Sequence, residues 1–462
     1  MTRPKHTLAR ICGFLALLLA AGCSPFAAST RPEAPAAGEG IDITVQIAPS
    51  DKPVETASLQ KRITRFREKY PGINVHTDNW QYAPDQIGIR IATNRIATEY
   101  NTYASEGRIL LQRKWMSDIT DLMSRWPHAG ELNPVLMKPF TVNGQYSAVP
   151  EQGYLMTVTL NKKLFREKGV PLPPLDWTWE EFLEAAVRVS DPERGIAGYV
   201  PMTKGNEAGW NWVSFLYAAG GDVAVETDGG IRSALYSEAG LRTLELYRAM
   251  KEARVLPTNW VMGYLDAFNH FSLGRGAMIM AGSGDVVDYA VNQGRMQAEE
   301  LVVYPMPSLV KGGRHTGIFG GNYHVISPYA APAQREWAFS FLTEEMFTET
   351  GLQALEEEIL DRKGLGQLYV PRLMNYWRPD SAYAEEVQGI LDKHENVYRF
   401  DPALLRLLDG KEEPLYEAQA CYAEIAGVIQ DVLTSKTEDP EARLKLASER
   451  LQAKVFDLLK GK

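Results

Sequence analysis

The chain has few cysteines. Only Cys12, Cys23 and Cys421 occur among 462 residues, and the first two lie in or beside an apolar run at the start of the chain. Cys421 is then the only thiol left for the folded part. No intramolecular disulfide is therefore expected there.

Catalytic and cofactor signatures are also missing. The sequence contains no HExxH, CxxC, GxSxG or GxxxxGK[ST] motif. Gly282-Ser283-Gly284 lacks the third glycine of a dinucleotide-binding fingerprint, and His270, His315 and His324 have no metal-ligand spacing. We therefore expect no catalytic residue, no metal and no cofactor.

Basic residues are outnumbered. The chain has 49 Lys and Arg against 58 Asp and Glu. Removing the first 22 residues takes away Arg3, Lys5 and Arg10 and no acidic residue, so 46 basic residues remain and the net charge is near −12. This balance disfavours nucleic acid as a partner, and it disfavours direct adhesion of the folded part to anionic lipid.

The first 22 residues have the pattern of a bacterial secretion signal. Basic residues precede the apolar run 11–21, whose eleven residues are too few for a bilayer-spanning helix of about 20 residues. The run ends in Leu19-Ala20-Ala21-Gly22-Cys23. This segment resembles the bacterial lipobox, which implies cleavage after residue 22 and a diacylglyceryl group on the thiol of Cys23.

Residues 23–40 are expected to form the lipidated cysteine and a flexible tether. Residues 24–40 contain Ala, Pro, Ser, Gly and Glu with almost no large apolar residues, so they cannot repay the entropy of ordering. As a flexible coil they would reach about 20–25 Å. We expect the protein on the outer face of the cytoplasmic membrane, at the cell surface of a Gram-positive bacterium.

The folded part begins with a strand, helix, strand pattern. Apolar residues alternate over residues 41–47, which predicts a strand with one buried face. Helical spacing follows over 59–70, Pro71-Gly72 ends the run, and residues 73–76 resume a strand. This order predicts a right-handed βαβ unit with a parallel strand pair.

Further segments support an α/β class. Thr178 and Glu181 have the spacing of a capping box at the start of a helix. Residues 324–327 read as a strand that leads to Pro332 at the first position of another helix. Residues 404–459 are mostly helical by pattern, with a break near 434–440.

Several segments, taken in order, resemble the family 1 extracellular solute-binding proteins, which include maltose-binding receptors. Each segment alone is a weak signal, and their shared order and spacing make the match specific. The matching segments are residues 66–75, 143–150, 160–165, 171–182, 271–278, 304–307 and 320–321.

The resemblance implies a two-lobed, periplasmic-binding-protein-like (type II) fold with hinge crossovers and a ligand cleft between the lobes. The N-terminal lobe would contain residues 41–150 plus 321–346, and the C-terminal lobe 151–320 plus 347–462. A hinge is expected at 149–156. The sequence departs from the family at 96–102, where a Pro-Asp dipeptide is absent, and it matches poorly after Glu345 until the terminal helices.

Sugars present hydroxyls and apolar C–H faces, so a sugar cleft needs aromatic platforms beside polar side chains. Trp210, Trp212 and Trp260 are favoured because Gly and Asn surround them, whereas Trp177 and Trp179 are assigned to helix entry. Core packing remains the alternative for each aromatic residue, and an ordinary surface position for each carboxylate. The predicted ligand-binding set is Trp80, Tyr82, Glu151, Tyr154, Trp210, Trp212, Trp260, Tyr264, Asp266, Gly320, Gly321 and Tyr323.

These patterns predict a monomeric substrate-binding lipoprotein of an ABC importer. It would hold a small polar solute such as a carbohydrate and deliver it to permease subunits served by a separate ATPase. Two alternatives stay open, a lipid-anchored enzyme acting on glycosides and a ligand-sensing lipoprotein without a transport role.

Overall fold

The computed structural model describes residues 40–47, 53–282, 284–434 and 439–459. The expected signal segment, the lipidated Cys23 and all of the tether except residue 40 lie outside these ranges. No helix within the described ranges has the length and apolar character needed to cross a membrane.

A nine-stranded mixed sheet runs through the molecule. Its main path has the order β2, β1, β3, β12, β6, β10, β7, and β11 and β13 pair with β6 and β12 respectively. The strands, in that order, are β2 (Ile73–Asn79), β1 (Ile41–Ile47), β3 (Glu99–Tyr103), β12 (Thr316–Ile326), β6 (Val149–Asn161), β10 (Gly276–Gly282), β7 (Ala197–Val200), β11 (Leu301–Tyr304) and β13 (Asp409–Glu412).

The first lobe surrounds strands β1, β2 and β3. β1 pairs in parallel with β2 and with β3, which confirms the parallel pair predicted for the first strand, helix, strand unit. Its helices are α1 (Pro53–Lys69), α2 (Ile87–Ala92), α3 (Gly107–Gln112), α4 (Thr120–Arg125), α5 (Pro134–Met137), α12 (Pro332–Thr343), α13 (Glu349–Gly364) and α14 (Ala382–Lys393). A small hairpin, β4 (Thr141–Val142) and β5 (Gln145–Tyr146), belongs to the same lobe.

The second lobe surrounds β10, β7 and β11. Its helices are α6 (Lys162–Glu167), α7 (Trp179–Val189), α8 (Asn206–Ala218), α9 (Glu238–Glu252), α10 (Tyr264–His270), α11 (Asp285–Asn292), α15 (Pro402–Leu407), α16 (Ala418–Leu433) and α17 (Pro440–Lys454). The predicted break near 434–440 falls between α16 and α17. A second hairpin joins β8 (Ala224–Thr227) to β9 (Gly230–Ser233).

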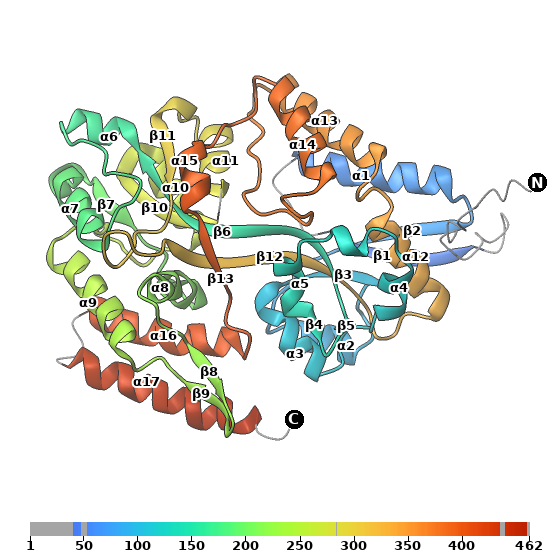
Figure 1. The fold of residues 1–462 in the computed structure, drawn as a ribbon, viewed down its shortest axis with the longest axis horizontal. Helices are drawn as coiled ribbons and strands as arrows, with labels where there is room; N and C mark the ends of the chain where they lie inside the picture. The colour runs from blue at the N-terminus through green and yellow to red at the C-terminus, as the bar shows by residue number, and fades with distance from the viewer. Residues whose placement is uncertain (1–39, 48–52, 283, 435–438, 460–462) are drawn as a thin grey trace, which may run out of the picture.

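Two long strands connect the lobes. β6 and β12 cross the middle of the molecule side by side in Figure 1 and pair antiparallel with each other. One end of each strand belongs to the first lobe, where β12 pairs with β3, and the other end belongs to the second, where β6 pairs with β10 and β11. The pairing shifts register between Asn322 and Tyr323, opposite Pro150. Proline cannot donate to a ladder, so an irregular point is where a sheet tolerates it.

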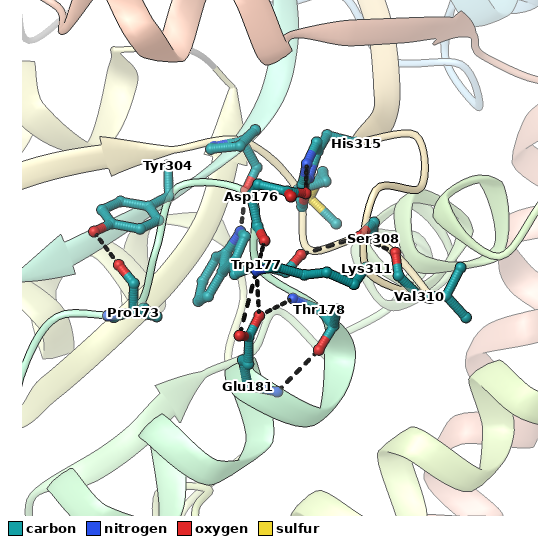
Figure 2. Close-up of polar contacts among 12 residues, drawn as sticks. Pro173, Asp176, Trp177, Thr178, Glu181, Tyr304, Ser308, Val310, Lys311 and His315 are labelled. Carbon is teal, nitrogen blue, oxygen red and sulfur yellow. Dashed lines mark hydrogen bonds and ion pairs between the residues drawn. The ribbon is translucent and has the colours of Figure 1, made fainter.

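The entry to α7 is anchored by the buried Trp177 (Figure 2). The indole Nε1 of Trp177 donates to the carbonyl of Pro305 at 2.9 Å, and the amide of Ser308 donates to the Trp177 carbonyl at 3.0 Å. Trp179 likewise donates to the carbonyl of Pro307 at 3.1 Å. Both tryptophans therefore have the packing role assigned to them.

The predicted capping box is present in the same region. The Thr178 hydroxyl accepts from the amide of Glu181 at 3.2 Å, and the Glu181 carboxylate accepts from the amide of Thr178 at 2.8 Å. His315 is buried beside it and contacts the carbonyl of Met306 at 2.7 Å and the carboxylate of Asp176 at 3.1 Å. This network holds two loops of the second lobe together, and His315 serves that packing.

The segment after residue 346 is divided between the lobes. Ile359 of α13 and Val387 of α14 share a hydrophobic core with Ile63 of α1 and Phe341 of α12. Figure 1 shows α13 and α14 lying over α1. The prediction that all of 347–462 belongs to the C-terminal lobe is therefore wrong for helices α13 and α14. The cause is tertiary packing, because Ile359 of α13 shares a core with Ile63 of α1 and Asp361 lies 2.8 Å from Lys61.

We predict opposite effects for alanine at two helical glycines. A Cβ at Gly209 in α8 would lie 2.4 Å from the Tyr422 backbone in α16, so Gly209→Ala should lower the free energy of unfolding by about 1–3 kcal/mol. Gly389 in α14 is exposed with no atom near that position, so Gly389→Ala should raise it by about 1 kcal/mol. Urea denaturation measures both, and a harmless Gly209→Ala would contradict the described packing.

Candidate ligand-binding site

A cavity of about 660 Å³ lies where the first lobe, the crossing strands and helix α11 of the second lobe meet. The carboxyl end of β1 and the length of β3 form one wall, α1, α13 and α14 form another, and residues 369–377 close a third side. Gly284 and Asp288 of the second lobe also line the cavity. This volume lies within the range of about 300–1,000 Å³ that small-molecule sites occupy.

The sheet presents a polar face to this cavity. Glu99, Asn101 and Tyr103 alternate along β3 and therefore lie on one side of the strand. On β12, His324 pairs with Asn101, and Asn322 pairs with Tyr103. The helices of an α/β protein ordinarily cover such a face with apolar contacts. Here a space lined by hydrogen-bonding groups remains instead.

A buried ion pair lies in this polar face. Nδ1 of His324 is 2.5 Å from Oε1 of Glu99, whose side chain is almost fully buried. Burial lowers the pKa of His324, but the attraction and hydrogen bond of Glu99 outweigh it, so the pKa of His324 lies above its ordinary value. Glu151 lies 3.9 Å from Nε2 of the same ring. The imidazole ring of His324 is thus held between two carboxylates.

Other charges around the cavity are also paired. Arg65 makes a two-pronged contact with Glu345, at 2.8 and 3.0 Å. Arg362 lies 3.1 Å from both Glu358 and Asp288. Arg372 forms an ion pair with Asp285. These arginine charges are thus neutralised within the protein, whereas Arg62, which also lines the cavity, donates to the carbonyls of Phe341 and Leu342. With most of its charges paired, the cavity suits a neutral solute that exchanges hydrogen bonds.

A second cluster lies on the crossing strands, in the second lobe. Nε1 of Trp210 donates to the Tyr154 hydroxyl at 3.2 Å, and the two rings meet edge to face at 5.8 Å. The carboxylate of Glu413 accepts from the hydroxyls of Tyr154 and Tyr422. Burial raises the pKa of Glu413 to about 7, with the tyrosine hydrogen bonds lowering it and Glu106 raising it.

Glu106 of the first lobe acts electrostatically on Glu413 of this cluster. Glu106 is buried, accepts a hydrogen bond from Tyr82 at 3.0 Å, and has a pKa raised chiefly by burial. Gln419 of α16 donates to the Ser105 hydroxyl at 3.3 Å. The lobes therefore touch on this side of the crossing strands as well.

The structure brings only Tyr82 and Glu151 of the predicted set to the cavity wall. Trp80, Trp212 and Tyr323 lie in hydrophobic cores instead. Trp210 and Trp212 belong to helix α8 and not to a loop, and Trp212 turns toward the core because its helical face is apolar. Trp80 and Tyr323 pack around Tyr100 and Phe140.

The remaining predicted aromatic residues lie in the second lobe. Trp260 packs on its core, and its carbonyl accepts from the Thr203 hydroxyl. The hydroxyl of Tyr264 donates to Asp285 at 3.2 Å, next to the Arg372 ion pair. Asp266 is exposed and accepts from the amide of Gly263 at 3.2 Å, so it caps α10.

At the two predicted glycines, other atoms of the protein occupy the space that a side chain would fill. A Cβ at Gly320 would lie 2.3 Å from Glu413 and 2.4 Å from the Tyr154 hydroxyl, and one at Gly321 would lie 2.6 Å from the carbonyl of Gln152. The missing side chains therefore make room for the Tyr154–Glu413 cluster and for the close pairing of β6 and β12.

The sequence prediction missed most of the cavity wall. The polar alternation of Glu99, Asn101 and Tyr103 in a strand was a usable signal, because most strands of an α/β sheet are apolar on both faces. Arg372, Asn375 and Tyr376 had no such signal, since they belong to no helix or strand. Only tertiary contacts bring them to the cavity wall.

A comparison of the sequence with known families identifies its relatives. The profile of bacterial extracellular solute-binding proteins matches residues 50–344, more than half of the chain. The chain belongs to this family. Its members are described as extracellular binding proteins, which places this one outside the cytoplasm and confirms the resemblance noted in the sequence. No curated protein matches the sequence.

Solved structures of similar fold confirm the two-lobed architecture. A solute-binding protein from Thermotoga lettingae with bound α-D-tagatose is 20% identical, with a TM-score of 0.68 over 89% of this chain and 98% of that one. The GacH receptor of Streptomyces glaucescens, studied unliganded and with acarbose, is 16% identical, with a TM-score of 0.70 over 89% and 98%. A Listeria monocytogenes substrate-binding protein in complex with cycloalternan is 16% identical, with a TM-score of 0.69 over 90% and 99%.

We predict that Glu413 makes stability depend on pH. Its pKa of about 7 in the folded state exceeds the ordinary value of 4.5, so the folded state favours the protonated carboxyl. The resulting stabilisation is complete below pH 4.5 and is lost as the pH rises through 7. Between these limits the free energy of unfolding of wild type should fall by about 3 kcal/mol relative to that of Glu413→Gln, measured by urea unfolding at a series of pH values. Glu252→Gln, at an exposed position on α9, is the control. Parallel curves for wild type and Glu413→Gln would contradict the prediction.

Proposed function

We propose that the protein is the substrate-binding lipoprotein of an ABC importer and holds a hydroxyl-rich solute, a carbohydrate or polyol, in the cavity between its lobes. The observation that carries this proposal is the polar, charge-paired cavity at the lobe boundary. Its lining offers amides, hydroxyls and paired charges, which can both donate to and accept from sugar hydroxyls.

The polar groups of the cavity suit a solute with many hydroxyls. Asn101 contacts Glu151 at 3.4 Å and His324 at 3.3 Å, so its amide is oriented before a ligand arrives. Tyr103 accepts from Gln81 at 3.1 Å and adds an aromatic ring to the wall. Oriented groups of this kind lose little freedom on binding, which favours affinity.

Proteins of the same fold support the ligand class. Similar structures contain α-D-tagatose, acarbose, maltose, ribitol and D-mannitol as bound solutes. All of these solutes are rich in hydroxyls. A cavity most of whose charges are paired fits this neutral class better than it fits an ionic solute.

The crossing strands supply the mechanism for capture. A solute that contacts both lobes shifts the population toward the closed form through its contacts with the second lobe. The closed form then presents both lobes to a permease, and a separate ATPase supplies the energy. The lipid on Cys23 would hold the receptor near that permease, because two acyl chains give stable membrane attachment.

The glycoside-active enzyme considered from the sequence gains no specific support. A glycosidase needs two carboxylates placed about 5–9.5 Å apart on either side of the scissile bond. Within the described residues, Glu99 is buried and engaged by His324, and Asp285 is engaged by Arg372 and Tyr264. These carboxylates serve the architecture of the wall.

We predict that Asn101→Ala weakens sugar binding about tenfold or more, because it removes an oriented amide from the cavity wall formed by β3. Isothermal calorimetry of the folded domain with D-tagatose, D-mannitol, maltose and maltotriose measures this change. Asn74→Ala, at an exposed position on β2, is the matched control and should keep wild-type affinity. Failure of every sugar and polyol of a broad panel to bind wild type would refute the proposed function.

We also predict that Cys23→Ser releases the protein from the membrane, since no thiol remains at position 23 to carry the diacylglyceryl group. Fractionation of cells and labelling with radioactive palmitate measure attachment and acylation. Cys12→Ser is the matched control and should stay attached, because Cys12 lies in the segment expected to be removed. Membrane-bound, labelled Cys23→Ser protein would show that the anchor lies elsewhere.

A further inference from the structure

One face of helix α11 carries contacts to the last turn of α13 and to the segment that follows it. Asp285, Asp288 and Asn292 lie three and four residues apart, so their side chains share that face. Arg372 pairs with Asp285, and Nη1 of Arg362 lies 3.1 Å from Oδ1 of Asp288. We call this contact between residues 285–292 and residues 362–372 the seam.

Backbone contacts extend the seam along the full helix. The side chain of Asn292 exchanges two hydrogen bonds with the backbone of Leu368, each of 2.9 Å. At the other end, Gly284 has a φ of 84°, and a Cβ there would lie 2.9 Å from Cγ1 of Val370. The seam therefore has contacts at every turn of α11.

The seam is largely withdrawn from water. The side chain of Arg362 is 9% exposed and that of Asp288 is 15% exposed. Arg362 also contacts Glu358 at 3.1 Å within its own helix. Separating a buried ion pair leaves a desolvated charge, which is strongly unfavourable. A ligand cannot part these groups by forming ordinary hydrogen bonds with them.

The same segment is fixed to the first lobe and to the crossing strands. The carbonyl of Met374 accepts from the amide of Gly153 at 3.1 Å, and the carbonyl of Tyr376 accepts from the amide of Asn133 at 2.7 Å. Arg372, Asn375 and Tyr376 also line the cavity. Residues 362–377 therefore form a wall of the cavity and join it to both lobes.

We propose that the seam limits the length of the ligand, and that Arg372 and Asp285 are specificity-determining residues. The protein then selects a solute of one or two sugar units, or an open-chain polyol of similar size, and excludes longer chains. On this side of the cavity, a longer chain would have to pass between Asp288 of α11 and residues 362–372, which line the cavity there. This inference rests on the proposed function, and Arg372 lies beyond the 50–344 range that the family profile matches, whereas Asp285 lies within it.

The test compares probes of increasing length in wild type and seam variants. Calorimetry with D-tagatose, D-mannitol, maltose, maltotriose and maltoheptaose gives a Kd for each. We expect wild type to bind at least one of the three short probes at least about tenfold more tightly than maltoheptaose. Arg372→Ala should reduce that ratio about tenfold by opening the seam, and the milder Arg372→Gln serves if Arg372→Ala fails to fold.

Arg378→Ala is the matched control. Arg378 follows the wall segment, its side chain is 48% exposed, and it pairs with Asp380 outside the cavity. This variant should keep the wild-type ratio. Hydrogen exchange of the α11 amides adds a readout that needs no ligand, and exchange should rise in Arg372→Ala and stay unchanged in Arg378→Ala.

Different results would refute the proposed function and the length limit set by the seam. If wild type binds none of the sugars or polyols, the proposed function is wrong and the length limit falls with it. If wild type binds maltoheptaose as tightly as the short probes, or if both Arg372 variants keep the wild-type ratio, the seam proposal alone is overturned.

Discussion

The antiparallel pairing of β6 with β12 is the constraint on which the rest of the structure depends. Both strands are long enough to serve two lobes, and their pairing continues between them. Without this pair the strands of the first lobe and those of the second lobe would not form one sheet. The irregular register at Asn322 and Tyr323 lies at the point where the strands pass from one lobe to the other. Bulged pairing of this kind twists and bends a strand locally.

The crossing strands also decide where polar groups can be buried. The main hydrophobic core of each lobe lies to one side of the crossing. Between these cores, Asn322, His324 and Gln152 of the crossing strands line the cavity. A polar group in such a position is tolerated only when it has a partner. Pairing of His324 with Glu99 meets that requirement and keeps the sheet face polar without an unbalanced charge. The cavity is thus a consequence of how the strands are covered.

The segment 349–397 contributes much of the cavity wall. Its helices α13 and α14 pack in the first-lobe core, and between them the chain crosses to α11 at residues 368–372. The lobes also meet near the clusters around Glu413 and Glu106, where Gln419 donates to Ser105. Tyr82, which donates to Glu106, also lines the cavity, so this contact borders the site.

The sequence by itself determined the local elements and the family, because periodicity, capping residues and ordered motifs act over short distances. The βαβ start, the capping box at Thr178 and the helix at Pro332 are all present as predicted. The binding surface was decided by the tertiary structure. Trp212 and Tyr323 are buried by helix and strand faces, whereas Arg372 reaches the cavity from a segment without regular structure. Only long-range packing decides which side of an aromatic or charged residue meets the solvent.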